Sequence, residues 1–200
     1  MRGPVIERRL LARITDKKAR LDALRPLPAA ALHRLREQIG VEMIYHSNAI
    51  EGSTLTLQET RLILETGLTI GGKSLREHFE VINHKDAIEY VESISEQDTP
   101  LSAFHVRQIH RLVLSRIDDE NVGQYRRTQV RIGGAQHVPP ESWEVPQRMQ
   151  DWENWLHQAE HELHPVVLAA QAHHRLAAIH PFVDGNGRTA RLVMNLVLFR

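Results

Sequence analysis

The sequence predicts an all-α protein that carries one short β-hairpin. Apolar residues recur at helical spacing through most of the 200 residues, and Ser/Thr-x-x-Glu capping boxes at Thr56 and Ser74 mark two helix starts. Pro146 and Pro165 stand where proline is common, at the first position of a helix. Residues 125–140 instead alternate polar and apolar side chains and turn on two glycines, which favours a hairpin.

The helices are predicted from the spacing of apolar residues and from the breaks between the apolar runs. Pro28 interrupts the first run, Gly71 and Gly72 mark a loop, and Ser102 is placed to cap a helix. The last helix is expected to begin near Gly187. The predicted helices cover residues 5–24, 29–46, 56–65, 74–94, 102–116, 146–156, 165–179 and 187–200.

Composition and charge exclude several function classes. Twenty-five Lys and Arg balance 25 Asp and Glu, so the net charge gives no reason to expect a nucleic acid or an anionic membrane as partner. The absence of cysteine excludes disulfide scaffolds, thiolate zinc sites and cysteine nucleophiles. The sequence has no apolar run long enough to span a membrane and no apolar core like that of a signal peptide. We therefore expect a cytoplasmic protein.

The loop HPFVDGNGRTAR, ahead of the last helix, concentrates residues suited to phosphate binding. Its glycines let backbone N–H groups turn toward a ligand, and a helix N-terminus carries positive partial charge. Arg188 and Arg191 lie three residues apart, so both can reach the same anion from one face of the first helical turn. The predicted phosphate cradle is the run Gly185, Asn186 and Gly187.

Two further side chains of this loop would supply chemistry beside the phosphates. Asp184 directly precedes the cradle, and a carboxylate beside bound phosphates usually holds a magnesium ion. His180 ends the preceding helix, where an imidazole can take a proton from an incoming hydroxyl. Phe182 is expected to face inward and anchor the loop. Each feature alone also occurs in ordinary turns, but their combination favours a phosphate-transfer site.

HPFVDGNGRTAR resembles, without a gap, the Fic family signature H-x-F-x-(D/E)-G-N-G-R-x-x-R. The resemblance extends over residues 40–200, including 123–126 and 163–165, and the family includes an animal enzyme of the endoplasmic reticulum. It implies a Fic-type helical bundle in which the hairpin is an exposed flap. It also implies protein adenylylation, the transfer of AMP from ATP to a Ser, Thr or Tyr hydroxyl. Doc-type members, which phosphorylate, carry a lysine where this chain has Gly187, so attack at the α-phosphorus is favoured.

The resemblance assigns roles to the residues of the loop. His180 would deprotonate the target hydroxyl, and Asp184 would bind Mg²⁺ that bridges the α- and β-phosphates of the ATP substrate. Arg188 would assist the cradle, and Arg191 would meet the γ-phosphate. The phosphates would be held by Gly185, Asn186 and Gly187.

The flap would lie over this site. By resemblance, it would help to cover the nucleotide and would clamp the backbone of a target protein by strand addition. Helical Fic proteins often form homodimers, and no patch of this sequence identifies a dimer interface. The flap residues with these roles are Ile132, Gly133, Gly134 and Ala135.

Residues 47–52, SNAIEG, match the inhibitory motif (S/T)-x-x-x-E-(G/N) of the family. From the residues alone, the segment is a helix end with Gly52 as its cap. The resemblance implies instead that Glu51, four residues after Ser47, pairs with Arg191 and blocks the guanidinium that the γ-phosphate needs. In some relatives the same glutamate positions water that removes AMP from the target, and the sequence leaves this reverse activity open.

The chain is expected to have three parts. An N-terminal helical extension covers residues 1–40, an inhibitory helix segment covers 41–70, and a Fic core domain covers 71–200. Because the chain stops at Arg200 inside a helical pattern, without a glycine cap, we expect the natural protein to continue beyond it.

The thirteen histidines raise a competing hypothesis of a metal site. Three of them would share one helix face if their helix continued to Leu163, but Pro165 interrupts the pattern and no H-E-x-x-H motif is present. Spacing alone is weak evidence for zinc, and solvated or capping histidines are the simpler interpretation. The histidines in question are His157, His161, His164, His173 and His174.

Two competing hypotheses concern the function itself. A non-catalytic helical regulatory or binding module would have no need to keep His180, Asp184 and Arg191 together, and magnesium-dependent ATP binding would distinguish it. A Fic-type transferase that uses another donor, UMP or phosphocholine, stays open. Base contacts in this family come partly from beyond the signature helix.

Overall fold

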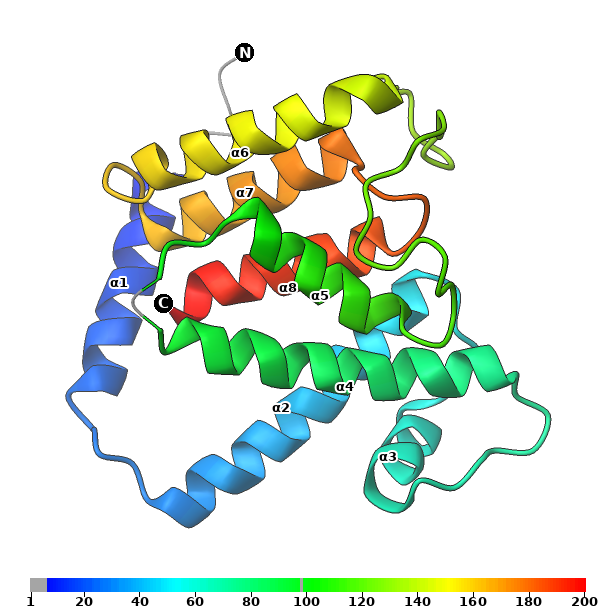
Figure 1. The fold of residues 1–200 in the computed structure, drawn as a ribbon. Helices are drawn as coiled ribbons and strands as arrows, with labels where there is room; N and C mark the ends of the chain where they lie inside the picture. The colour runs from blue at the N-terminus through cyan, green and yellow to red at the C-terminus, as the bar shows by residue number, and fades with distance from the viewer. Residues whose placement is uncertain (1–6, 98) are drawn as a thin grey trace. The chain divides into compact units, whose positions relative to one another are not determined.

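The structure is a computed structural model that describes residues 7–97 and 99–200, and the predicted all-α class is confirmed. Residues 1–6, which include the start of the predicted first helix and of the predicted N-terminal extension, lie outside the described residues. The chain divides into two compact units, Met1–Ile39 and Gly40–Arg200. The first unit contains α1 and the first half of α2, and the second contains the loop of the signature (Figure 1).

The helices of the described residues begin and end close to the predicted positions. The largest difference is in α2, which continues to Ile50 rather than ending at residue 46. None of the described helices is long and apolar enough to cross a membrane. The elements are α1 (Arg8–Asp22), α2 (Ala29–Ile50), α3 (Leu57–Thr66), α4 (Leu75–Ser95), α5 (Ala103–Leu114), η1 (Ser142–Glu144), α6 (Val145–Ala159), α7 (Pro165–Ile179) and α8 (Asn186–Phe199).

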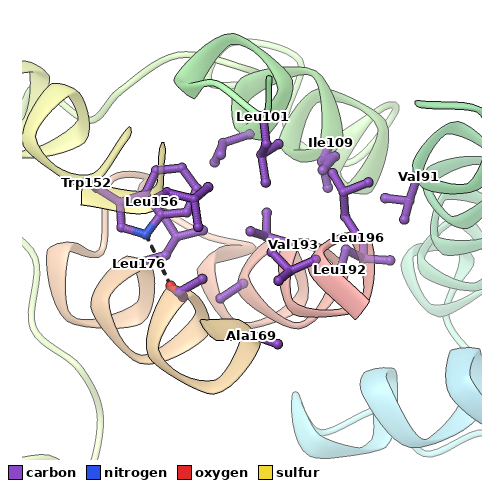
Figure 2. Close-up of a cluster of buried hydrophobic side chains, with 14 of the residues drawn as sticks. Val91, Leu101, Ile109, Trp152, Leu156, Ala169, Leu176, Leu192, Val193 and Leu196 are labelled. Atoms are coloured by element: carbon purple, nitrogen blue, oxygen red, sulfur yellow. Dashed lines mark hydrogen bonds between the residues drawn. The ribbon is translucent and has the colours of Figure 1, made fainter. Parts of the chain in front are cut away.

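In the second unit, α8 packs against α4, α5 and α7, and α6 packs on α7 and α5 (Figure 1). The short connection between α7 and α8 makes these two helices a hairpin. Trp152 of α6 donates its indole N–H to Ala172 O of α7 at 3.2 Å, inside a core drawn from five helices (Figure 2). Because this core fixes α7 and α8, the loop between them is held at both ends.

A second, smaller core positions the C-terminal half of α2. Ile44 of α2 packs with Leu55, Ile63 of α3 and Val81 of α4, and each is at most 4% exposed. Full burial of each of these side chains contributes roughly 1.5–3 kcal/mol of stability relative to leaving it exposed. This cluster holds the last turns of α2 in place beside α4.

The predicted β-hairpin at residues 125–140 is not confirmed. None of the described residues in this segment forms a strand. The glycines do turn the chain, since Gly134 has φ 72° and Ala135 N–H donates to Ile132 O at 3.2 Å. The flap is therefore a loop with a tight turn at its tip.

Side-chain bonds replace the expected ladder of the hairpin. Arg126 Nη2 donates to Pro140 O at 2.5 Å, and Gln129 Nε2 donates to Pro139 O at 3.1 Å. Two consecutive prolines, Pro139 and Pro140, have no N–H to give to a partner strand. An isolated pair of strands with so short an alternation is also only marginally stable. The long side chains of Arg126 and Gln129, on the N-terminal limb of the flap, therefore bond to backbone carbonyls on its C-terminal limb.

Candidate active site

The loop between α7 and α8 is held in one shape by its own side chains. Asn186 accepts the N–H of Phe182 at Oδ1 and donates from Nδ2 to Phe182 O, both at 2.9 Å. Phe182 is fully buried, as predicted, and stacks on His110 with ring centroids 3.6 Å apart. The Asn186 side chain is thus committed to the loop, and the first-turn N–H groups of α8 are what the cradle offers to an anion.

His110 of α5 is a site residue that the signature does not reveal. Its Nδ1 accepts the N–H of Gly123 at 3.0 Å, which leaves the proton on Nε2 for Asp184 O, also at 3.0 Å. Burial lowers the pKa of His110 to about 4, so the ring is neutral at physiological pH. Gly185 packs against the same ring at φ 72°, where an added Cβ would lie 3.4 Å from it. The sequence signal that could have revealed His110 was a polar residue on the otherwise apolar, buried face of α5.

His180 caps α7 in the left-handed region, at φ 51°. Its side chain is partly buried, and Nδ1 lies 3.3 Å from Ala177 O, which favours a proton on Nδ1 and leaves Nε2 as an acceptor. Burial lowers the pKa of His180; the charge of Arg126 lowers it further, while the Ala177 contact and Glu51 raise it. The ring is therefore neutral at pH 7, the state that a general base needs.

Arg126 fixes the backbone around His180. It is 3% exposed, its Nε donates to His180 O at 2.8 Å, and its backbone N–H donates to Pro181 O at 2.9 Å. The rest of its guanidinium donates to Thr128 O at 3.1 Å and to Pro140 O at 2.5 Å. One buried side chain thus joins the left-handed residue of the loop to both limbs of the flap.

Asp184 lies at the edge of the cradle with a partly exposed carboxylate. Its Oδ1 accepts the N–H of Gly185 at 2.6 Å and lies 3.7 Å from Arg188 Nη2. Its Oδ2 accepts Arg76 Nη2 at 2.6 Å. Burial alone would raise the pKa of Asp184, but the Gly185 bond and the two arginines outweigh it and lower the pKa. The group is thus an anion across the physiological range.

Glu80 joins two arginines of the site. Its Oε1 lies 3.1 Å from Arg76 Nε and 3.2 Å from Arg188 Nη1. Arg188 is only 2% exposed; its Nη1 is paired with Glu80 without hydrogen-bond geometry, and its Nε has no hydrogen-bond partner within the described part of the chain. Buried donors of this kind are suited to an anion. Arg76 and Glu80 are four apart on α4, so their helical spacing was a signal that the sequence contained.

The end of α2 brings Ser47 and Glu51 to Arg191. Arg191 Nη2 donates to Glu51 Oε1 at 2.7 Å and to Ser47 O at 2.9 Å, while Nε donates to Ser47 Oγ at 2.9 Å. Three contacts from one guanidinium therefore go to α2 and the residue that follows it. The side chains of Arg191 and Glu51 are 19% and 33% exposed, so this pair is partly shielded from water.

The carboxylate of Glu51 also covers part of the cradle. A Cβ added to Gly187 would collide with Glu51 Oε1 and lie 3.1 Å from Arg191 Nη1. The space directly over Gly187 is thus filled by a negative charge, at the N-terminus of α8, where an anionic ligand would approach.

The flap contacts the site through side chains that lie outside its tip. Besides Arg126, His137 contributes, because its Nε2 lies 2.9 Å from Ala178 O in α7. At the tip, Ile132 is half-buried and residues 133–135 are exposed. The flap residues singled out by the sequence therefore form its outer turn.

The residues beside the cradle fit a magnesium ion better than the histidines fit zinc. His157 Nε2 lies 2.8 Å from Leu101 O, and His164 Nδ1 accepts the N–H of Val166 at 3.2 Å to cap α7. Over residues 7–97 and 99–200, no three His, Asp or Glu side chains gather to hold a metal. Magnesium needs fewer, because it takes one or two carboxylates together with phosphate oxygens and water. Asp184 is the carboxylate in position for this.

Comparison with known proteins places this site among its relatives. Residues 100–198 match the model of the Fic/DOC family. The chain is 42% identical to protein adenylyltransferase Fic of Drosophila grimshawi over 195 residues, 97% of this chain and 40% of the relative. It is 41% identical to the protein of the same name from Drosophila willistoni, over 98% of this chain and 39% of the relative. The chain thus spans about two fifths of the length of these curated relatives.

Solved structures share the fold over nearly the whole chain. A Fic domain-containing signalling protein from Bacteroides thetaiotaomicron has a TM-score of 0.86 and 33% identity, over 93% of this chain and 72% of that one. A fragment of Fic-1 from C. elegans has a TM-score of 0.85 and 35% identity, over 96% of this chain and 56% of that one. The similarity reaches further toward the N-terminus than the resemblance seen over residues 40–200. With its signature loop and this fold, the chain belongs to the Fic/DOC family.

Proposed function

We propose that this protein transfers AMP from ATP to a Ser, Thr or Tyr hydroxyl of a target protein. The observation that carries the proposal is the braced loop, which presents a neutral His180, an ionised Asp184 and the N-terminus of α8 within seven residues of sequence. The identity to curated adenylyltransferases supports AMP as the transferred group.

The proposed reaction uses each of these groups. His180 Nε2 takes the proton of the target hydroxyl while the hydroxyl oxygen forms a bond to the α-phosphorus of ATP. The bond from that phosphorus to the bridging oxygen breaks, and pyrophosphate leaves. The N-terminus of α8 and Arg188 hold the phosphates, and Asp184 would hold the magnesium ion. When bound, magnesium supplies positive charge that stabilises the phosphate oxygens and the leaving group.

Glu51 is, in this proposal, an inhibitory residue. Its carboxylate engages Arg191 and fills the space over Gly187, so a triphosphate would meet a negative charge where its γ-phosphate needs a cation. ATP would then bind out of line for attack. Release requires only that the end of α2 withdraw from Arg191, since the cradle itself is braced by Asn186 and Phe182.

The flap is the proposed docking site for the target. Its turn at residues 132–135, which is exposed at 133–135, would offer the backbone groups that the turn's own Ala135–Ile132 bond does not use to an extended segment of another protein. Because these contacts are to backbone, they would place the hydroxyl of the target without selecting much of its sequence. Because Arg126 bonds to both the flap and His180 O, it would keep the docked segment and His180 in a fixed relative position.

Labelled donors test the chemistry of the transfer directly. We would incubate Glu51→Gly protein and Mg²⁺ with ATP labelled at either the α- or the γ-phosphorus, and in parallel with UTP and CDP-choline. AMP transfer predicts protein-bound label from α-labelled ATP and none from γ-labelled ATP. Label from the γ-position would instead show phosphorylation. Modification by UTP or CDP-choline alone would show that the donor is not ATP and that the transferred group is UMP or phosphocholine.

The pH dependence of the reaction follows from His180. A general base works in its neutral form, and burial holds the pKa of His180 below its ordinary value of 6.5. We expect the rate to reach half its maximum below pH 6.5, so initial rates change little between about pH 8 and pH 7 and decline at more acid pH. Rates measured with Glu51→Gly protein across this range, with folding checked at each pH, give the profile. A rate that halves near pH 7 or above would be contrary to a buried, neutral base.

Arg126→Lys tests the connection between the flap and His180. Lysine keeps the charge but cannot make the separate bonds that the guanidinium makes to His180 O and Pro140 O. We expect kcat to fall by about tenfold to a hundredfold, because the base loses its position, with ADP affinity within about twofold of the parent. Steady-state rates and calorimetry measure the two. Equal losses in kcat and in ADP affinity would point to a general distortion of the site instead.

A further inference from the structure

Arg76 stands outside the signature and outside the roles assigned above. It lies in the first turn of α4, its side chain is 54% exposed, and its Nη2 lies 2.6 Å from Asp184 Oδ2. We propose that Arg76 is a gate on the metal position: it occupies the oxygen of Asp184 that a magnesium ion would use, and must release it when the magnesium–nucleotide complex binds. This inference rests on the proposed role of Asp184.

The two oxygens of Asp184 differ in what they can offer a metal. Oδ1 is turned into the loop, where it accepts the N–H of Gly185 at 2.6 Å and faces the buried Arg188. Among the described residues, Oδ2 contacts only Arg76, whose side chain is half-exposed. A metal that reached Asp184 without unfolding the loop would therefore bind Oδ2.

A guanidinium and a divalent cation compete for that oxygen. Both would sit within a few ångströms of it, and the repulsion between a single and a double positive charge at such a distance is large even when partly screened. Arg76 is the partner that can move, because an ion pair between exposed side chains contributes little stability. Asp184 is held by Gly185 and by the His110 bond to its carbonyl.

Glu80 gives Arg76 a place to remain after release. Its carboxylate is 10% exposed and is fixed between Arg188 Nη1 and Arg76 Nε, at 3.2 and 3.1 Å. The Nε contact is separate from the Nη2 contact with Asp184, so the guanidinium can turn about the first while it gives up the second. The gate is therefore tethered, and it returns when the metal leaves.

The coupling between magnesium and nucleotide isolates this effect. In the Glu51→Gly background, we would measure the Kd of ADP by calorimetry with Mg²⁺ and with EDTA, and take the ratio of the two. The ratio cancels any direct contact between Arg76 and the phosphates that is the same in both conditions. Variants Arg76→Gln and Arg76→Lys remove and keep the charge, respectively. Lys85→Gln is the matched control, since Lys85 pairs with Glu89 farther along α4, at 3.8 Å.

The gate predicts that Arg76→Gln raises the ratio of the Kd with EDTA to the Kd with Mg²⁺ by about threefold to fivefold, the upper range for an exposed ion pair. Arg76→Lys and Lys85→Gln should stay within about twofold of the parent. An unchanged ratio in Arg76→Gln, or an equal rise in Arg76→Lys, would overturn the gate while leaving the proposed function intact. A parent protein that binds ADP equally with and without Mg²⁺ would overturn the metal role of Asp184 itself, and the gate with it.

Discussion

Glu51→Gly is expected to raise the rate of AMP transfer by about tenfold to a hundredfold, the range of a typical coupling between two sites. The substitution frees Arg191 Nη2 from its 2.7 Å contact and clears the space over Gly187. The γ-phosphate then gains the cation and the room that the carboxylate denies it. Initial rates with α-labelled ATP and Mg²⁺ give the measurement.

The control for this variant is Glu65→Gly. Glu65 is an exposed glutamate in the last turn of α3, so its replacement matches the loss of charge and the gain of backbone freedom at a helix end. We expect its rate to equal that of the wild type. Ser47→Ala should produce a smaller rise than Glu51→Gly, because Ser47 O still accepts Arg191 Nη2. If Glu51→Gly, correctly folded, were no faster than Glu65→Gly, Glu51 would not be an inhibitory residue.

His180→Asn in the Glu51→Gly background is expected to reduce the transfer rate by about a hundredfold to ten-thousandfold, the contribution of a general base. Asparagine is chosen because His180 has φ 51°, and asparagine tolerates the left-handed region better than most residues. The substitution therefore removes the imidazole and keeps the turn that Arg126 holds.

Binding separates this loss from a damaged site. The cradle is shaped by Asn186 and Phe182 rather than by the imidazole, so ADP affinity with Mg²⁺ should stay within about twofold of the Glu51→Gly parent. A variant that still binds ADP but no longer transfers AMP assigns the chemical step to His180. Retention of more than about a tenth of the parent rate would assign the base elsewhere.

The sequence predicted the parts of the site that depend on local spacing. Helix geometry alone places Arg188 and Arg191 one turn apart on α8, while the anion cradle indicated by glycines beside a helix start stays a prediction. The family signature then supplied roles that no spacing could, and SNAIEG pointed to a pair that the structure brings to 2.7 Å. The inward position of Phe182 was predicted as well.

The parts that were missed depend on packing between distant segments. His110, Arg76 and Glu80 come from α5 and α4, and no motif joins them to the loop that they support. The hairpin is not confirmed for a related reason. The alternation at residues 125–140 and its two glycines favour a hairpin, whereas Arg126 and Gln129 hold that segment through bonds from side chain to backbone.

Intact-mass spectrometry tests the central claim, adenylylation restrained by Glu51, most directly. Wild type, Glu51→Gly and Glu51→Gly/His180→Asn would each be incubated with ATP and Mg²⁺, and the intact mass of each protein would be measured before and after the incubation. The proposal predicts an AMP adduct on Glu51→Gly, little on wild type and none on the double variant. A phosphate adduct, equal adducts on wild type and Glu51→Gly, or no adduct on a Glu51→Gly protein shown to bind ATP with magnesium would contradict it.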